Sequence, residues 1–153
     1  MKNELYVASS WRNEYYSDVL VKLIDAGLEP YDFKNPVAGN TGFHWSEIDP
    51  DWLDWTPEKF AKALSHPLAD EGFAFDMAAL DECKACILVL PAGRSAHLEA
   101  GYARGAKKPT YIYCPPYVQK VRFEPELMYK MTKGFYTDLD ALIVDLKKTM
   151  ETL

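Results

Sequence analysis

The sequence predicts an α/β protein with a flavodoxin-like, doubly wound sandwich fold, in which helices cover both faces of a mostly parallel sheet of about five strands. Short apolar segments alternate along the chain with longer segments whose apolar residues recur at helical spacing. This alternation of strands and helices favours parallel strands. The length of 153 residues matches one domain, so residues 1–153 are expected to form a single domain.

The first elements are short and clearly separated. Residues 4–9 (ELYVAS) predict the first strand, because they form a short apolar run followed by polar residues. Residues 13–26 predict a helix, since their apolar side chains recur every three or four positions, and Gly27 stands where a left-handed C-cap is favoured. Residues 28–33 predict a short second strand.

A long loop begins at residue 35, where Pro, Gly and Asn residues break any regular pattern. It carries three of the four tryptophans, and it ends where Thr56 and Pro57 supply an N-cap and a first helical residue. The later segments alternate again. They predict a helix over 67–83, a strand over 86–91, a helix from Ala96, a strand over 110–113, a short helix over 124–130, a strand over 134–136 and a helix over 139–150.

Ligands of doubly wound sheets bind beyond the carboxyl ends of the strands, which here are followed by loops after Ala8, Phe33, Pro91 and Tyr113. The loop after Pro91 leads into a helix that carries Glu99, which is expected in the first helical turn. Free backbone N–H groups and the helix dipole favour an ionised carboxylate there. The alternative is that Glu99 only complements the dipole, as many acids in first turns do.

A second carboxylate, Asp76, lies on a predicted helix among aromatic residues. If it reaches the cleft, partial desolvation raises its pKa and suits it to donate a proton, whereas a surface position gives it no such role. Glycosidic chemistry requires two carboxylates with different roles.

In the long loop, Phe43 and Trp45, which flank His44, are candidates for stacking on a nucleobase, unless they close over a core instead.

The turn before the Glu99 helix offers an anion site. Arg94 and Ser95 lie beside the free N–H groups of a helix start, where a 5′-phosphate binds readily, although an exposed Arg in a turn is commonly only solvated. The same GRSAH turn nearly forms the nucleophile elbow of serine hydrolases. His97 stands in place of the second glycine of that elbow, and no later histidine completes a catalytic triad. The sequence therefore disfavours a serine hydrolase.

Composition excludes several classes of function. The formal charge of −6 and the absence of a basic stripe disfavour a nucleic acid partner. The apolar runs are too short for a membrane span and the N-terminus lacks a signal core, so a cytoplasmic protein is expected. Three cysteines predict reduced thiols, and Cys83 and Cys86 lie where a helix gives way to a strand, unlike a redox motif. Scattered histidines and missing glycine-rich motifs imply no metal and no cofactor.

Four segments, LYVASSW, FDMAAL, SAHLEAGYA and ELMY, carry a family resemblance. The sequence resembles the nucleoside 2-deoxyribosyltransferases and the related N-glycosidases that act on deoxynucleoside 5′-monophosphates. The resemblance implies that Glu99 is the nucleophile of a covalent glycosyl intermediate, that Tyr6 orients it and that Asp76 exchanges a proton with the base. It also implies a homo-oligomer, transfer to a free base acceptor in the transferases, and substrate contacts from Ser9, Trp11 and Met128.

Two positions depart from the transferase pattern. Gly93 stands where these transferases tend to carry an acid, and Glu126 replaces an asparagine that reaches the sugar in a neighbouring subunit. Both changes concern the sugar contacts and the choice between a hydrolase and a transferase. A glycohydrolase acting on NAD-type nucleotides and a nucleotide-binding sensor without turnover are the remaining alternatives, because the fold alone excludes neither.

Overall fold

The computed structural model describes residues 4–119 and 122–153. Contacts within the chain divide it into two compact units. Residues 4–31 and 80–153 form the first, which we call the sheet unit, and residues 32–79 form the second, the aromatic unit. The expectation of a single domain over residues 1–153 stays a prediction.

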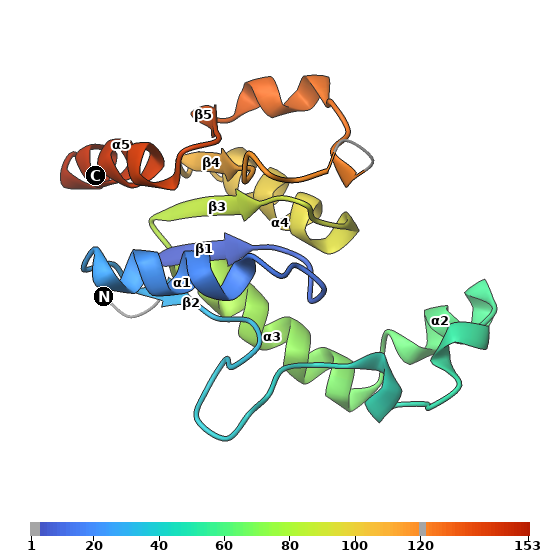
Figure 1. The fold of residues 1–153 in the computed structure, drawn as a ribbon. Coiled ribbons are helices and arrows are strands. Elements are labelled where there is room, and N and C mark those ends of the chain that lie inside the picture. Colours follow the sequence, from blue (N-terminus) through green and yellow to red (C-terminus); the bar gives the residue numbers. More distant parts are fainter. Residues whose placement is uncertain (1–3, 120–121) are drawn as a thin grey trace. The chain divides into compact units, whose positions relative to one another are not determined.

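The sheet unit is built on five parallel strands in the order β2-β1-β3-β4-β5 (Figure 1). This order is the flavodoxin-like one, so the predicted fold class is confirmed. The strands are β1 (Leu5–Ala8), β2 (Pro30–Tyr31), β3 (Ala85–Val89), β4 (Thr110–Tyr113) and β5 (Gly134–Tyr136).

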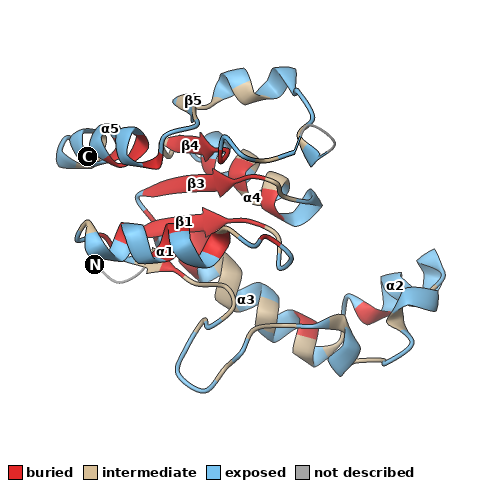
Figure 2. Cartoon of the chain, in the orientation of Figure 1, coloured by how far each residue is buried: buried red, intermediate tan, exposed pale blue. Residues whose placement is uncertain are grey.

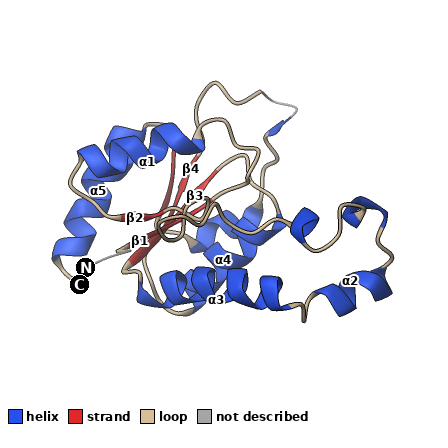
Figure 3. Ribbon diagram, turned by 90° about the horizontal axis from the view of Figure 1, so that it is seen from below, coloured by secondary structure: helices blue, strands red, loops and turns tan. Residues whose placement is uncertain are grey.

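Helices of the sheet unit cover both faces of the sheet. Helices α1 (Tyr16–Asp25) and α5 (Leu139–Glu151) lie on one face, and α4 (Arg94–Gly105) lies on the other (Figure 3). Gly27 has a φ of 84°, as expected of the left-handed residue that follows α1. The Asp138 side chain caps α5 by accepting hydrogen bonds from the first N–H groups of that helix.

The core lies in the middle strands. Every residue of β1, β3 and β4 is buried (Figure 2), because helices pack on both sides of them. This explains why these strands read as continuous apolar runs rather than as alternating patterns. Strand β5 is an edge strand and is less buried, since it pairs with another strand on one side only.

The predicted elements differ from the structure mainly at their ends. Strand β2 has two residues instead of six, because Asp32 accepts a hydrogen bond from the Lys34 N–H and turns the chain away from the sheet. The expected helix over 124–130 is a 3₁₀ helix, η4 (Leu127–Met131), which begins after Glu126 because the Glu126 carboxylate accepts from the Met128 N–H.

The aromatic unit contains the long loop and most of a helix. Its elements are η1 (Trp45–Glu47), η2 (Trp52–Asp54) and α2 (Pro57–Ala63), and α3 (Pro67–Glu82) continues into the sheet unit. The Thr56 side chain accepts from the Lys59 N–H, so the predicted N-cap of α2 is confirmed. In the part of the chain that the structure describes, no helix is both long and apolar enough to span a bilayer.

Candidate active site

Tyr6 and Glu99 meet within the sheet unit, although 93 positions separate them in sequence. Tyr6 lies in β1 with a fully buried side chain, and its hydroxyl donates a hydrogen bond to Glu99 Oε2 in α4. The Glu99 side chain itself is half-buried. A half-buried carboxylate held by a buried phenol is oriented and still within reach of a ligand.

The sheet explains why Tyr6 points toward α4. Parallel register pairs Tyr6 with Tyr31 on one side and with Cys86 on the other, so the three side chains project from the same face. The Tyr6 ring stacks on Tyr31 with ring centroids 5.5 Å apart and an interplanar angle of 22°. Helix α4 packs against β1 and β3, which places Glu99 above this row of side chains.

The prediction that Glu99 lies in the first turn of its helix is wrong. Helix α4 begins at Arg94, two residues before the expected start at Ala96, because Gly93 already serves as its N-cap. The first turn therefore contains no acid, and Glu99 is the sixth helical residue. The helix dipole acts mainly within the first turn. We therefore assign the orientation of the Glu99 carboxylate to the hydrogen bond from the Tyr6 hydroxyl.

The residues that do occupy the start of α4 are the predicted phosphate contacts. Arg94 and Ser95 are both exposed, as is the N-cap Gly93. The first N–H groups of this 12-residue helix have no partner in the preceding turn of the helix. The roles of Gly93, Arg94 and Ser95 in substrate binding stay predictions.

Ser9 and Trp11 follow β1 at the carboxyl edge of the sheet, but they differ in their surroundings. Trp11 is 40% exposed, whereas Ser9 is buried and donates a hydrogen bond of 2.9 Å to the Val89 carbonyl oxygen. The Ser9 hydroxyl also accepts a hydrogen bond from Asn13, for which the sequence pattern predicted only a position at the beginning of a helix. The sequence feature that could have indicated this role is the position of Asn13 just before α1, where polar side chains commonly form hydrogen bonds with nearby backbone groups.

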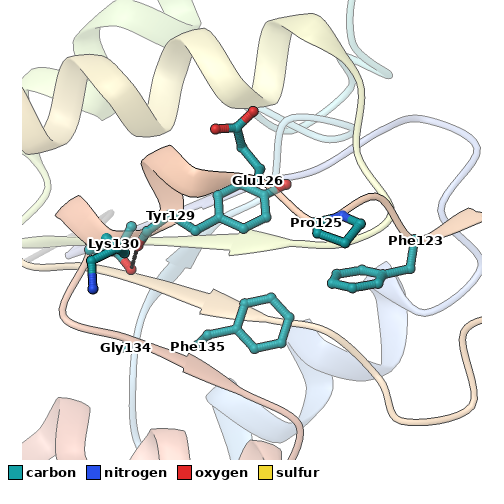
Figure 4. A pocket seen from close by; sticks show the side chains of 8 residues that line it. Phe123, Pro125, Glu126, Tyr129, Lys130, Gly134 and Phe135 are labelled. Carbon is teal, nitrogen blue, oxygen red and sulfur yellow. Dashed lines mark hydrogen bonds between the residues drawn. The ribbon is translucent and has the colours of Figure 1, made fainter.

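Glu126 and Met128 lie at the start of η4, and both are exposed. Glu126 also lines a groove with a volume of about 470 Å³, together with three aromatic residues. In Figure 4 the Glu126 carboxylate points away from the ring of Phe135, another residue of the groove lining. The contacts expected from Glu126 and Met128 stay predictions. The groove is lined by Phe123, Pro125, Glu126, Tyr129, Lys130, Thr132, Gly134 and Phe135.

His97 connects η4 to α4. Its Nδ1 lies 2.7 Å from the Gly93 carbonyl oxygen and its Nε2 lies 2.8 Å from the Tyr129 hydroxyl. Since a carbonyl oxygen only accepts, Nδ1 carries a hydrogen and donates it to Gly93. Both ring nitrogens are therefore engaged with partners other than Ser95, which gives no support to a serine hydrolase.

In the aromatic unit, Phe43 and Trp45 belong to one cluster. Their ring centroids are 4.7 Å apart, and Trp45 also packs edge-on against Trp55 and Phe60. Phe43 lies close to α3: a Cβ atom added at Gly72 of this helix would be 2.8 Å from the Cβ atom of Phe43. The cluster gives these rings a packing role in addition to any base stacking, which stays a prediction.

The two other candidate residues of the aromatic unit differ in burial. Asp76 lies in α3 and is half-buried, whereas His44 is exposed and precedes η1. Asp76 neighbours Phe75 and Met77 along the helix, as the sequence indicated. Its role as a proton donor and the substrate contact expected from His44 stay predictions.

The three cysteines are buried free thiols. Cys83 follows α3 and Cys86 lies in β3, so their predicted place between a helix and a strand is confirmed. Burial raises the pKa of all three thiols, most strongly for Cys86, where Cys83 and then the Glu99 charge add to the effect. Among the described residues, no three His, Cys, Asp or Glu side chains are grouped so that they could hold a metal ion.

These surroundings predict unreactive thiols. Because the thiolate is the reactive form and a raised pKa lowers its population, we expect a disulfide reagent at pH 8 to modify fewer than one thiol per native chain within minutes. All three thiols should react once the chain is unfolded in denaturant. Rapid modification of the native protein would contradict the burial of Cys83, Cys86 and Cys114.

No protein-family model and no curated protein matches this chain. Among solved structures, the chain is similar to the CMP N-glycosidase BcmB from Clostridium botulinum, with 14% sequence identity and a TM-score of 0.47. The similarity covers 94% of this chain and 97% of that chain.

Proposed function

We propose that this protein cleaves the N-glycosidic bond of a 2′-deoxynucleoside or of its 5′-monophosphate, through a covalent glycosyl intermediate on Glu99. The observation that carries the proposal is the hydrogen bond from the buried Tyr6 hydroxyl to Glu99 Oε2. The resemblance of the segments around Tyr6, Asp76 and Glu99 to the 2-deoxyribosyltransferases supports the same assignment.

The chemistry follows from the two carboxylates. In the first step a Glu99 oxygen bonds to the anomeric carbon while the carbon–nitrogen bond breaks and its electron pair goes to the base. Asp76, in its neutral form, donates a proton to the departing base. In the second step water, or a second base, attacks the anomeric carbon and releases Glu99, and Asp76 takes a proton back.

Tyr6 contributes orientation rather than a bond to the substrate. By holding Oε2, its hydroxyl fixes the plane of the Glu99 carboxylate, and an oriented nucleophile loses less entropy on reaching the transition state. The stacking of Tyr6 on Tyr31 in turn fixes the Tyr6 ring. We assign the 5′-phosphate, where the substrate has one, to the start of α4 beside Arg94 and Ser95.

Replacement of Tyr6 by Phe tests this orientation. The ring and its packing remain, so we expect kcat to fall about tenfold or more, because a hydrogen bond to a charged group contributes about 1.5–3 kcal/mol. Tyr111→Phe is the matched control, since Tyr111 is equally buried in β4 but its hydroxyl donates to Thr149 on α5. An equal loss in both variants would show that the effect comes from the core and not from Glu99.

Product analysis tests the function itself. The protein is incubated with each deoxynucleoside and each deoxynucleoside 5′-monophosphate, with and without a second free base, and the products are separated by chromatography. Release of base alone identifies a hydrolase, and formation of a new nucleoside identifies a transferase. Absence of both products from every substrate overturns the proposal, and nicotinamide release from NAD under the same conditions would replace it.

A further inference from the structure

Asn13 is a buried polar residue of the sheet unit that the proposed chemistry does not use. Its side chain is 4% exposed, and its amide nitrogen lies 3.0 Å from Ser9 Oγ, 3.2 Å from the Val89 carbonyl oxygen and 3.1 Å from the Pro91 carbonyl oxygen. The Ser9 hydroxyl donates to the same Val89 oxygen. One amide group therefore joins the segment after β1 to the segment after β3.

The other end of the amide fixes its orientation. Asn13 Oδ1 accepts a hydrogen bond of 2.7 Å from the Tyr15 N–H at the entry to α1. A flipped amide would turn the oxygen toward the Val89 and Pro91 oxygens and would lose the bonds to both of them, as well as the bond from the Tyr15 N–H. The side chain is thus held from two directions, by α1 and by the end of β3.

The backbone that Asn13 holds leads directly to the start of α4. Pro91 lies two residues before Gly93, the N-cap of α4, and the exposed Arg94 and Ser95 follow. In this turn, the bond to the Pro91 oxygen is supplied by a buried side chain rather than by sheet pairing, since β3 ends at Val89. The position of the α4 start relative to β1 consequently depends on Asn13.

We propose that Asn13 is a positioning residue that sets substrate affinity by fixing the turn of residues 90–93, an inference that rests on the proposed function. Asn13 acts through the backbone of this turn and does not touch the reacting atoms. The Tyr6–Glu99 hydrogen bond is formed by β1 and by the second turn of α4, so the chemical step depends less on the turn. Loss of Asn13 therefore raises KM more than it lowers kcat.

Asn13→Asp is the sharpest variant, because it keeps the shape and the acceptor for Tyr15 but replaces two N–H donors by an oxygen that faces two carbonyl oxygens. Asn13→Ala removes the bonds without adding charge and serves if the first variant does not fold. We expect KM to rise about tenfold in each and kcat to change less than about threefold, on the scale of one or two lost buried hydrogen bonds. Ser17→Ala, at an exposed position of α1, is the control.

Hydrogen exchange of the free protein tests the positioning without substrate. The amides of Leu90 and His97 report on the turn from either side, since they donate to Tyr113 and to Gly93. Faster exchange at these amides, together with the rise in KM, supports the proposal. Unchanged exchange in both Asn13 variants overturns it, as does a fall in kcat at unchanged KM. If the unmodified protein releases no base, the proposed function fails, and exchange with nucleotide affinity from calorimetry still decides the role of Asn13.

Discussion

Replacing Glu99 by Gln is expected to lower the rate of base release at least about 10³-fold, because an amide lacks the nucleophilic oxygen that a covalent mechanism requires. The Gln side chain is isosteric and its amide oxygen still accepts from the Tyr6 hydroxyl, so the sheet and α4 should stay in place. Substrate binding, measured by calorimetry, should change little. The loss thus falls on kcat.

The intermediate gives this prediction a direct readout. Protein stopped with acid during turnover should carry one sugar residue on the peptide that contains Glu99, detected by mass spectrometry, and the Gln variant should carry none. Glu151→Gln, at an exposed position in the last turn of α5, is the matched control and should keep full activity. Turnover of the Glu99→Gln protein at the normal rate would remove Glu99 from the mechanism.

Asp76→Asn is expected to lower base release by about 10²-fold to 10⁴-fold, the range for loss of a general acid–base group. The change keeps the size of a half-buried side chain and removes only its ability to exchange a proton. The loss should depend on the leaving group. A 7-methylguanine nucleoside already carries a positive charge on its base and leaves without a donated proton, so the variant should cleave it at close to the normal rate.

This dependence separates proton donation from structural damage. A variant that has lost the shape of the aromatic unit should fail on both kinds of substrate, whereas a variant that lacks only the proton donor fails on the uncharged base. Asp70→Asn, at an exposed position in the first turn of the same helix, controls for the loss of one negative charge in α3. Equal losses on both substrates would exclude Asp76 as the general acid.

The net negative charge of the chain lies in the residues of the aromatic unit. Residues 32–79 contain nine acidic and three basic residues, a net charge of −6, whereas the remaining residues contain fourteen of each. The acidic surplus of the chain therefore falls within residues 32–79, the unit that carries Asp76.

The start of α4 shows how far local pattern carries. The sequence predicted a strand, a tight turn and a helix over this region, because apolar runs and glycine turns are local properties. It placed the helix start at Ala96, whereas the helix begins at Arg94, and this shift of two residues moved Glu99 from the first turn to the second. The helix dipole, which acts mainly within the first turn, is therefore not the interaction that holds the Glu99 carboxylate.

The sequence by itself determined the order and type of the elements, the parallel sheet and the identity of the candidate residues through a family resemblance. These follow from periodicity, capping residues and short motifs, which are all encoded over a few neighbouring positions. Only the tertiary structure decided that Tyr6 holds Glu99 across 93 positions and that Asn13 joins the ends of β1 and β3. Such contacts depend on strand order and register, which arise from packing of the whole sheet and leave no local signal.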